Sequence, residues 1–338
     1  GTCVVSGFEG RDPAADVEAF SPAPFPYYGD ITIGLVSLGG SPDRARLGEQ
    51  RYDFATGELH TRFEFDAPDA RATVDVLNFC SRTMPTVVAQ EIELRVDRPC
   101  DLQLRAGIDP THTPGRWAKR MVTQAGTASA EVDGVLQWLS LEELSAAGFA
   151  YVTTFEGADA ERTTDPSVAA PLATTYRWRA EPGRSVRLRQ LTAAVPSVVH
   201  STPELQAVRT ALDAHRLGFE RLRRDNAKAW ESIWRSRIVV DAPAGWQAMI
   251  DAACFYLWTS VHPSSPSSMS LFGLSYWPNY HYYRGHVMWD IETFAVPPLL
   301  LTMPDSARAI LDYRFRNLEA ARNNARSHGY LGAQFPWE

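Results

Sequence analysis

The sequence predicts a protein built of strands first and helices second: an antiparallel β-sandwich, then a helical linker, then a helical domain. Residues 1–200 alternate polar and apolar side chains with a period near two, the pattern of strands that bury one face. Residues 201–237 change to helical apolar spacing, and residues 238–338 hold further helical segments joined by loops. These three stretches are the domains that we expect.

Short strands follow one another through the first 200 residues. The clearest alternation lies in five segments, which are 30–38, 59–66, 70–79, 86–96 and 100–108. Turn-forming residues separate such runs at intervals of roughly 8–12 residues, which favours a large antiparallel sandwich over a parallel sheet. Asp133 and Gly134 stand between two alternating runs, and an Asp-Gly pair predicts a tight hairpin turn.

The linker is predicted to start at Thr202, because Thr is a common N-cap and Pro203 fits the first turn of a helix. Apolar residues then recur at helical spacing as far as Arg235, which fits one long helix or a pair of helices. The next run, “RIVVD” at 237–241, has the β-branched composition of a short strand.

Three helices are predicted in the C-terminal part, over 245–262, 289–302 and 304–329. The last is expected to end at Gly329, because Gly commonly terminates helices. A loop without periodicity, residues 263–286, separates the first two helices. Loops of this length in compact domains are usually functional or disordered, and the aromatic residues in this one argue against disorder.

Composition excludes several classes of function. Net charge is −7 and the pI about 5.7, so the chain lacks the basic face that nucleic acids require. It contains no apolar run long enough to span a membrane. Nothing resembles a phosphate-binding glycine loop, and His112 has no second metal ligand at suitable spacing, so we expect no metal and no cofactor. The sequence does not identify a compartment; the cytoplasm is our expectation.

Carboxylates beside aromatic residues are the strongest candidates for chemistry. Trp289 precedes Asp290, Glu292 follows, and the sequence ends in Trp337 and Glu338. Such carboxylates could act as acid and base in glycoside cleavage, which needs two of them. They could equally bind sugar hydroxyls while the indole covers the ring. A structural alternative also stays open, because Asp290 stands where a helix begins and Asp is a favoured N-cap.

Three long motifs carry a resemblance to a known family. They are “GHVMWD” at 285–290, “DYRFRNLEAARNNA” at 312–325 and “GYLGAQFPWE” at 329–338. Through them the chain resembles glycoside hydrolase family 65, which contains disaccharide phosphorylases, trehalases and α-glucoside hydrolases. The resemblance implies a β-sandwich, a helical linker and an (α/α)6 catalytic barrel, of which residues 238–338 would form the N-terminal part.

The resemblance also implies which residues bind substrate. The pairs Trp289–Asp290 and Trp337–Glu338 would line the subsite for the non-reducing glucose. Arg284 and His286 would be neighbours of that subsite. The family's general acid lies much further along the chain than its Trp-Asp motif. We therefore expect the acid beyond residue 338, an N-terminus that begins inside the sandwich, and a chain that is incomplete and inactive alone.

The function implied is hydrolysis, with inversion, of an α-glucosidic bond in a disaccharide or short glucoside such as kojibiose, trehalose or maltose. An inverting disaccharide phosphorylase is the alternative, with inorganic phosphate as co-substrate. A non-catalytic carbohydrate-binding remnant is an alternative of another class. The partners expected are an α-glucoside and, if the barrel is to close, a complementary chain; a homodimer also fits. Neither nucleic acid nor membrane is expected.

Overall fold

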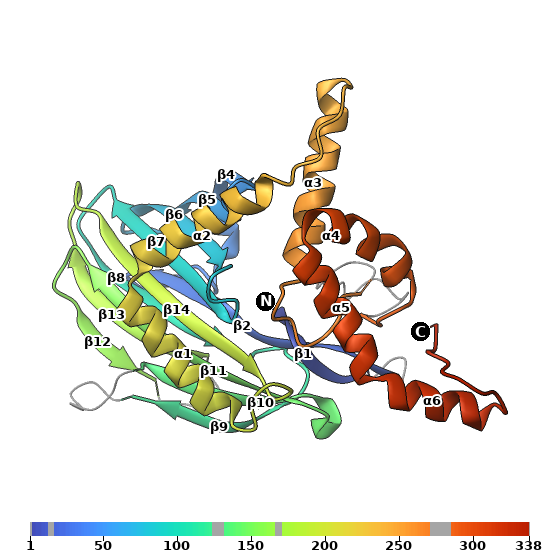
Figure 1. Ribbon diagram of the computed structural model, residues 1–338. Helices are drawn as coiled ribbons and strands as arrows, with labels where there is room; N and C mark the ends of the chain where they lie inside the picture. The colour runs from blue at the N-terminus through green and yellow to red at the C-terminus, as the bar shows by residue number, and fades with distance from the viewer. Residues whose placement is uncertain (1, 13–16, 124–131, 166–170, 271–284, 338) are drawn as a thin grey trace.

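The computed structural model describes residues 2–12, 17–123, 132–165, 171–270 and 285–337. Strands occupy the first part of the chain and helices the second (Figure 1). The predicted order of a β-sandwich followed by a helical domain is confirmed. Among the described helices, none is both long and apolar enough to cross a membrane.

The sandwich consists of two antiparallel sheets. The first has the order β1-β2-β8-β13-β12, and β3 pairs with β2. Its strands are β1 (Thr2–Asp12), β2 (Val17–Ile33), β3 (Val36–Ser37), β8 (Cys100–Asp109), β12 (Glu161–Thr164) and β13 (Leu172–Ala180). The second sheet has the order β4-β5-β6-β7-β14-β11-β10-β9. Its strands are β4 (Ala45–Asp53), β5 (Glu58–Asp66), β6 (Arg71–Cys80), β7 (Val87–Val96), β9 (Arg116–Val122), β10 (Gly134–Leu139), β11 (Ala146–Glu156) and β14 (Val186–Pro196).

The two sheets bury their facing apolar side chains against one another. Leu104 of the first sheet and Phe65, Leu94 and Leu188 of the second lie in one cluster and are almost completely buried. Burial of this kind contributes roughly 2 kcal/mol for each large side chain. The period-two alternation predicted this packing, because successive side chains of a strand point to opposite faces.

The predicted Asp-Gly hairpin turn is wrong. Gly134 is already the first residue of β10 and pairs with Val122 of β9, so the connection includes Asp133 and the residues before it. The Asp133 carboxylate is instead buried, where it accepts hydrogen bonds from the Thr153 amide at 3.0 Å and the Thr174 hydroxyl at 2.9 Å. Asp133 is therefore a buried hydrogen-bond acceptor inside the sandwich and not a turn residue.

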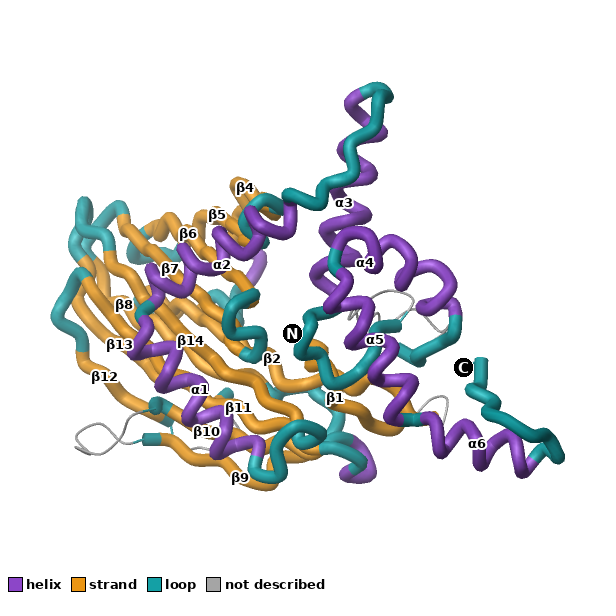
Figure 2. The backbone as a smooth tube through the Cα atoms, viewed as in Figure 1, coloured by secondary structure: helices purple, strands orange, loops and turns teal. Residues whose placement is uncertain are grey.

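The linker is a pair of helices, α1 (Pro203–Leu217) and α2 (Phe219–Trp234). They separate at Gly218, whose φ of 87° suits glycine because it lacks a Cβ. Figures 1 and 2 show both helices lying across the outer face of the second sheet. The contact is close: a Cβ added to Gly148 of β11 would clash with the backbone of Pro203 at the start of α1.

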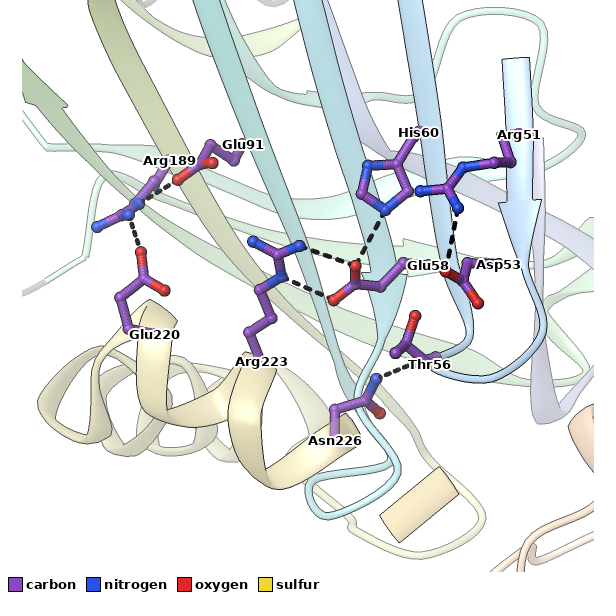
Figure 3. Close-up of polar contacts among 10 residues, drawn as sticks. All are labelled: Arg51, Asp53, Thr56, Glu58, His60, Glu91, Arg189, Glu220, Arg223 and Asn226. Atoms are coloured by element: carbon purple, nitrogen blue, oxygen red, sulfur yellow. Dashed lines mark hydrogen bonds and ion pairs between the residues drawn. The ribbon is translucent and has the colours of Figure 1, made fainter. Parts of the chain in front are cut away.

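Polar contacts fix α2 to the second sheet (Figure 3). The Arg223 guanidinium donates two hydrogen bonds, of 2.7 and 2.9 Å, to the buried carboxylate of Glu58. His60 Nε2 lies 3.0 Å from the same carboxylate. One turn further on, the Asn226 amide donates to the Thr56 carbonyl at 2.8 Å.

The helix continues the attachment with two indole rings. Trp230 packs on the turn between β4 and β5, where a Cβ on Gly57 would clash with the indole. Trp234 donates from Nε1 to the Phe54 carbonyl at 2.7 Å. Helix α2 is therefore held against the second sheet by contacts along its length, up to the point where the chain enters the helical part.

We expect the substitution Glu58→Gln to lower the free energy of unfolding by roughly 2 kcal/mol, because it leaves Arg223 facing a neutral amide in a buried site. This loss of stability is smaller than the loss expected for a fully buried ion pair, because the Arg223 side chain is 36% exposed. Urea denaturation measures it. Glu220→Gln is the matched control: Glu220 of α2 also pairs with an arginine, Arg189 of β14, but the Glu220 side chain is 65% exposed. Equal losses in both variants would contradict the expected role of Glu58.

Beyond the linker the chain forms α3 (Ala244–Ser260), a π-helical turn (Ile291–Ala295) that runs into α4 (Val296–Thr302), α5 (Pro304–Arg316) and α6 (Leu318–Ser327). Figure 1 shows α5 beside strand β1 of the sandwich, whereas α3 extends away from it. The core of the helical part includes residues from α2, α3, α4 and α5, which are Trp230, Phe255, Trp258, Leu299 and Ile310. Closure of the helices into an (α/α)6 barrel stays a prediction.

Two details of the helical prediction are wrong. The run at 237–241 forms no strand; the Gln247 side chain bonds it instead, accepting from the Val240 amide at 3.0 Å and donating to the Ile238 carbonyl at 2.9 Å. The single helix predicted over 304–329 is two helices that separate at Asn317. Its predicted end is confirmed, because α6 stops just before Gly329, which has a φ of 79°.

Candidate functional site

Two segments that are distant in sequence meet at the start of the π-helical turn. Trp337 donates a hydrogen bond from Nε1 to Oδ2 of Asp290 at 3.0 Å, across 47 residues of chain. The bond has an ionised acceptor, which makes it stronger than a bond between neutral groups. It brings together two of the motifs that the sequence singled out, “GHVMWD” and “GYLGAQFPWE”.

The N-cap alternative for Asp290 is wrong. Its backbone is already helical, with φ −53° and ψ −29°, and its side chain makes no capping hydrogen bond. The carboxylate instead bonds the Trp337 indole. A carboxylate has about four directions from which it can accept, so Asp290 can bind a ligand hydroxyl while it holds the indole.

The prolines at the start of α4 explain the π-helical turn that follows Asp290. Pro297 and Pro298 have no amide hydrogen, so neither can donate to the carbonyl four residues earlier as a regular α-helix requires. The chain widens here, and the Val296 amide bonds the carbonyl of Ile291, five residues back. Such turns are frequent at functional sites.

The widened turn carries Glu292, whose carboxylate is held by Arg314 of α5. Arg314 donates from Nε to Oε1 at 2.8 Å and from Nη2 to Oε2 at 3.0 Å. Both side chains are mostly buried, with 15% and 24% exposed for Arg314 and Glu292. Because both oxygens of Glu292 already accept from one guanidinium, the carboxylate is poorly placed to exchange a proton with a ligand.

The two tryptophans of the site keep much of their surface accessible. Trp289 is 54% exposed and Trp337 is 47% exposed. Large aromatic side chains are usually covered, so two half-exposed indoles, one next to Asp290 in the sequence and one bonded to its carboxylate, are suited to cover the apolar face of a ring. The site therefore combines a hydroxyl acceptor with two flat apolar surfaces.

His286, four residues before Asp290, lies in the wall of a cavity of about 930 Å³ between the sandwich and the helices, whose lining does not include Trp289, Asp290 or Trp337. Strands β1 and β2 contribute Glu9, Arg11 and Phe20 to this wall. The cavity is the size of an ordinary small-molecule site. Arg284, the other predicted neighbour, and Glu338, which is predicted to line the subsite with Trp337, lie outside the described residues.

The structure thus brings Asp290 and Trp337 into contact and places Trp289 and His286 beside them in the chain. Sequence reasoning missed Arg314, although it lies inside a quoted motif, because nothing local shows which carboxylate an arginine reaches. It also missed the sandwich wall of the cavity. Within the described ranges no group of three or more His, Cys, Asp or Glu side chains could hold a metal ion.

Comparison with protein families places the chain. Residues 44–233 match “Glycosyl hydrolase family 65, N-terminal domain”, and residues 279–338 match “Glycosyl hydrolase family 65 central catalytic domain”. The chain belongs to glycosyl hydrolase family 65. The second match covers the Trp289–Asp290 pair and Trp337, so the site lies in the part of this family 65 chain that corresponds to the catalytic domain.

Several curated proteins are similar to this family 65 chain. A kojibiose hydrolase of Flavobacterium johnsoniae is 32% identical over 169 residues, which are 49% of this chain and 24% of that protein. A protein-glucosylgalactosylhydroxylysine glucosidase of Gallus gallus is 37% identical over 35% of this chain and 18% of its own. A kojibiose phosphorylase of Halothermothrix orenii is 36% identical over 36% of this chain and 15% of its own. The matches thus span a quarter or less of these relatives.

A solved structure extends the likeness to the whole fold. A putative kojibiose phosphorylase from the human microbiome matches 99% of this family 65 chain and 45% of its own chain, with a TM-score of 0.78 and 15% identity. The likeness confirms the fold, in which a β-sandwich precedes helices.

Proposed function

We propose that the protein cleaves the α-glucosidic bond of a disaccharide or short glucoside, and that Trp289, Asp290 and Trp337 bind the non-reducing glucose. The hydrogen bond between Trp337 and Asp290 carries this proposal, because it builds one site from two separate motifs. In that site the carboxylate accepts bonds from sugar hydroxyls, and the exposed indoles cover the ring. Glu338 and Arg284 complete the proposed subsite.

Hydrolysis with inversion is the reaction that we propose. A general acid protonates the leaving oxygen, and a second carboxylate activates a water on the opposite face of the sugar. Asp290 fixes the glucose rather than transferring the proton, since its carboxylate holds the Trp337 indole. Glu292 is not assigned the acid role either, because Arg314 occupies both of its oxygens. The acid and base are therefore proposed to come from residues other than these.

Phosphorolysis is the second candidate. The similarity to a kojibiose phosphorylase of Halothermothrix orenii and to the solved fold of a putative kojibiose phosphorylase favours it. Inorganic phosphate would then attack in place of water and no general base would be needed. Incubation with kojibiose, trehalose and maltose, with and without phosphate, separates the two reactions. The anomer is read by NMR on the glucose unit that carries the cleaved bond, labelled with 13C in that unit alone, because the leaving glucose adds its own anomers. Labelled β-glucose supports inverting hydrolysis, labelled β-glucose 1-phosphate supports phosphorolysis, and labelled α-glucose as first product contradicts both.

Sugar binding by the 338-residue chain can be measured without turnover. We expect glucose to bind in isothermal titration calorimetry, and Trp337→Phe to weaken that binding roughly fivefold, because Phe keeps an aromatic surface and loses the hydrogen bond that orients Asp290. Trp246→Phe on α3 is the control, because Trp246 is 60% exposed and belongs to neither motif. Absence of glucose binding by the unmodified chain would overturn the proposed subsite, and binding without turnover of any glucoside would support a carbohydrate-binding role.

A further inference from the structure

Arg314 contacts both segments that form the proposed glucose subsite. Its guanidinium holds Glu292, two residues after Asp290, and lies 3.5 Å from the carbonyl of Val287, two residues before Trp289. The same group lies over the ring of Phe335, 5.4 Å from its centre and two residues before Trp337. One side chain of α5 thus contacts both the segment that contains Asp290 and the segment that contains Trp337.

The burial of this group decides how firmly it holds its partners. Only 15% of the Arg314 side chain is exposed, whereas most other ion pairs on α5 and α6 are open to water. Arg308, on the same helix, is 80% exposed and its pair with Asp312 is 3.8 Å long. A two-bond pair shielded from water fixes orientation, while a long exposed pair contributes little.

Two links therefore join the same segments. The Trp337–Asp290 hydrogen bond is one, and Arg314, through Glu292 and Phe335, is the other. Two links separated along the chain restrict rotation of one segment against the other, which a single hydrogen bond cannot do. The π-helical turn strengthens the argument, because it is the widened backbone that carries Glu292 next to Asp290.

We propose that Arg314 is a positioning residue for the glucose subsite, one that sets the angle between Asp290 and Trp337 through Glu292 and Phe335 without touching the sugar. This role rests on the proposed function. It assigns to the motif “DYRFRNLEAARNNA” a task in substrate binding, although α5 itself contributes none of the proposed subsite residues.

The test uses Arg314→Met and, as a matched control, Arg308→Met on the same helix. Glucose affinity is measured by calorimetry, and the Trp337 indole N–H signal is followed by NMR, assigned by its loss in Trp337→Phe. We expect Arg314→Met to weaken glucose binding about tenfold, the value of one misplaced charge-assisted hydrogen bond, and to shift the Trp337 signal. Arg308→Met should change neither.

A purely structural role predicts a different result. If Arg314→Met lowers the unfolding temperature but leaves glucose affinity and the Trp337 signal unchanged, the proposal is overturned. Arg314→Lys keeps the charge without the two-pronged geometry, and should shift the same signal if Arg314→Met does not fold. If the unmodified chain binds no glucose, the proposed function fails, yet the Trp337 signal still decides whether Arg314 positions that indole.

Discussion

Replacement of Asp290 by Asn is expected to weaken glucose binding roughly 30-fold, the effect of about 2 kcal/mol from charge-assisted hydrogen bonds to sugar hydroxyls. Asn keeps the shape of the side chain and an oxygen that can accept from Trp337. Because the Asp290 side chain caps no helix, the substitution changes charge and little else. Calorimetric titration with glucose, beside thermal unfolding, measures the effect.

The control for this substitution is Asp312→Asn on α5. The Asp312 side chain is 54% exposed and its ion pair with Arg308 is 3.8 Å long, so we expect no change in glucose affinity. The proposed role of Asp290 would be refuted by equal affinities in Asp290→Asn and the unmodified chain. A loss of stability that matches the loss of affinity would likewise point to a structural carboxylate.

Truncation of Trp230 to Ala is expected to lower the free energy of unfolding by roughly 3–5 kcal/mol. The Trp230 side chain is 2% exposed and packs against Phe255 of α3, with ring centres 4.9 Å apart. The Arg82 guanidinium, which donates to the Trp258 carbonyl of α3, lies 5.4 Å from the same indole. Sheet, linker and helical part therefore meet at one ring.

Because three parts share this ring, its loss should also separate their unfolding. We expect urea denaturation of Trp230→Ala to show the β-rich circular dichroism signal and the helical signal changing at different concentrations, whereas the unmodified chain shows one transition. Trp246→Ala, which removes an indole that is 60% exposed, is the control and should cost less than about 1 kcal/mol. One shared transition in Trp230→Ala would show that the coupling has another source.

The periodicity of the sequence predicted most strands and helices, because alternation and helical spacing are local consequences of burying one face. It failed where a distant or unusual partner replaced a local one. Gln247 supplies hydrogen bonds that the run at 237–241 would have found in a sheet. Asp133 serves as a buried acceptor rather than a turn residue.

In the candidate site, too, the sequence predicted residue types but not which distant side chains pair. Resemblance to a family pointed to the Trp-Asp and Trp-Glu motifs, while spacing alone left Asp290 open between a cap, a sugar ligand and an acid. Only coordinates show that Trp337 and Asp290 share a hydrogen bond and that Arg314 pairs with Glu292. Such pairings depend on how α5 and the segment after α6 pack against the π-helical turn, and no local pattern encodes that packing.

The contact between Gly57 and Trp230 has an evolutionary consequence. Gly57 has a φ of 66°, which other residues adopt at a cost, and any Cβ there would strike the indole of Trp230. A larger residue at 57 therefore requires a smaller one at 230. That exchange removes the indole that packs against both the β4–β5 turn and Phe255 of α3. Homologues of this chain should keep both residues or change both together. Positions 57 and 230 should therefore covary, although they lie 173 positions apart in the sequence.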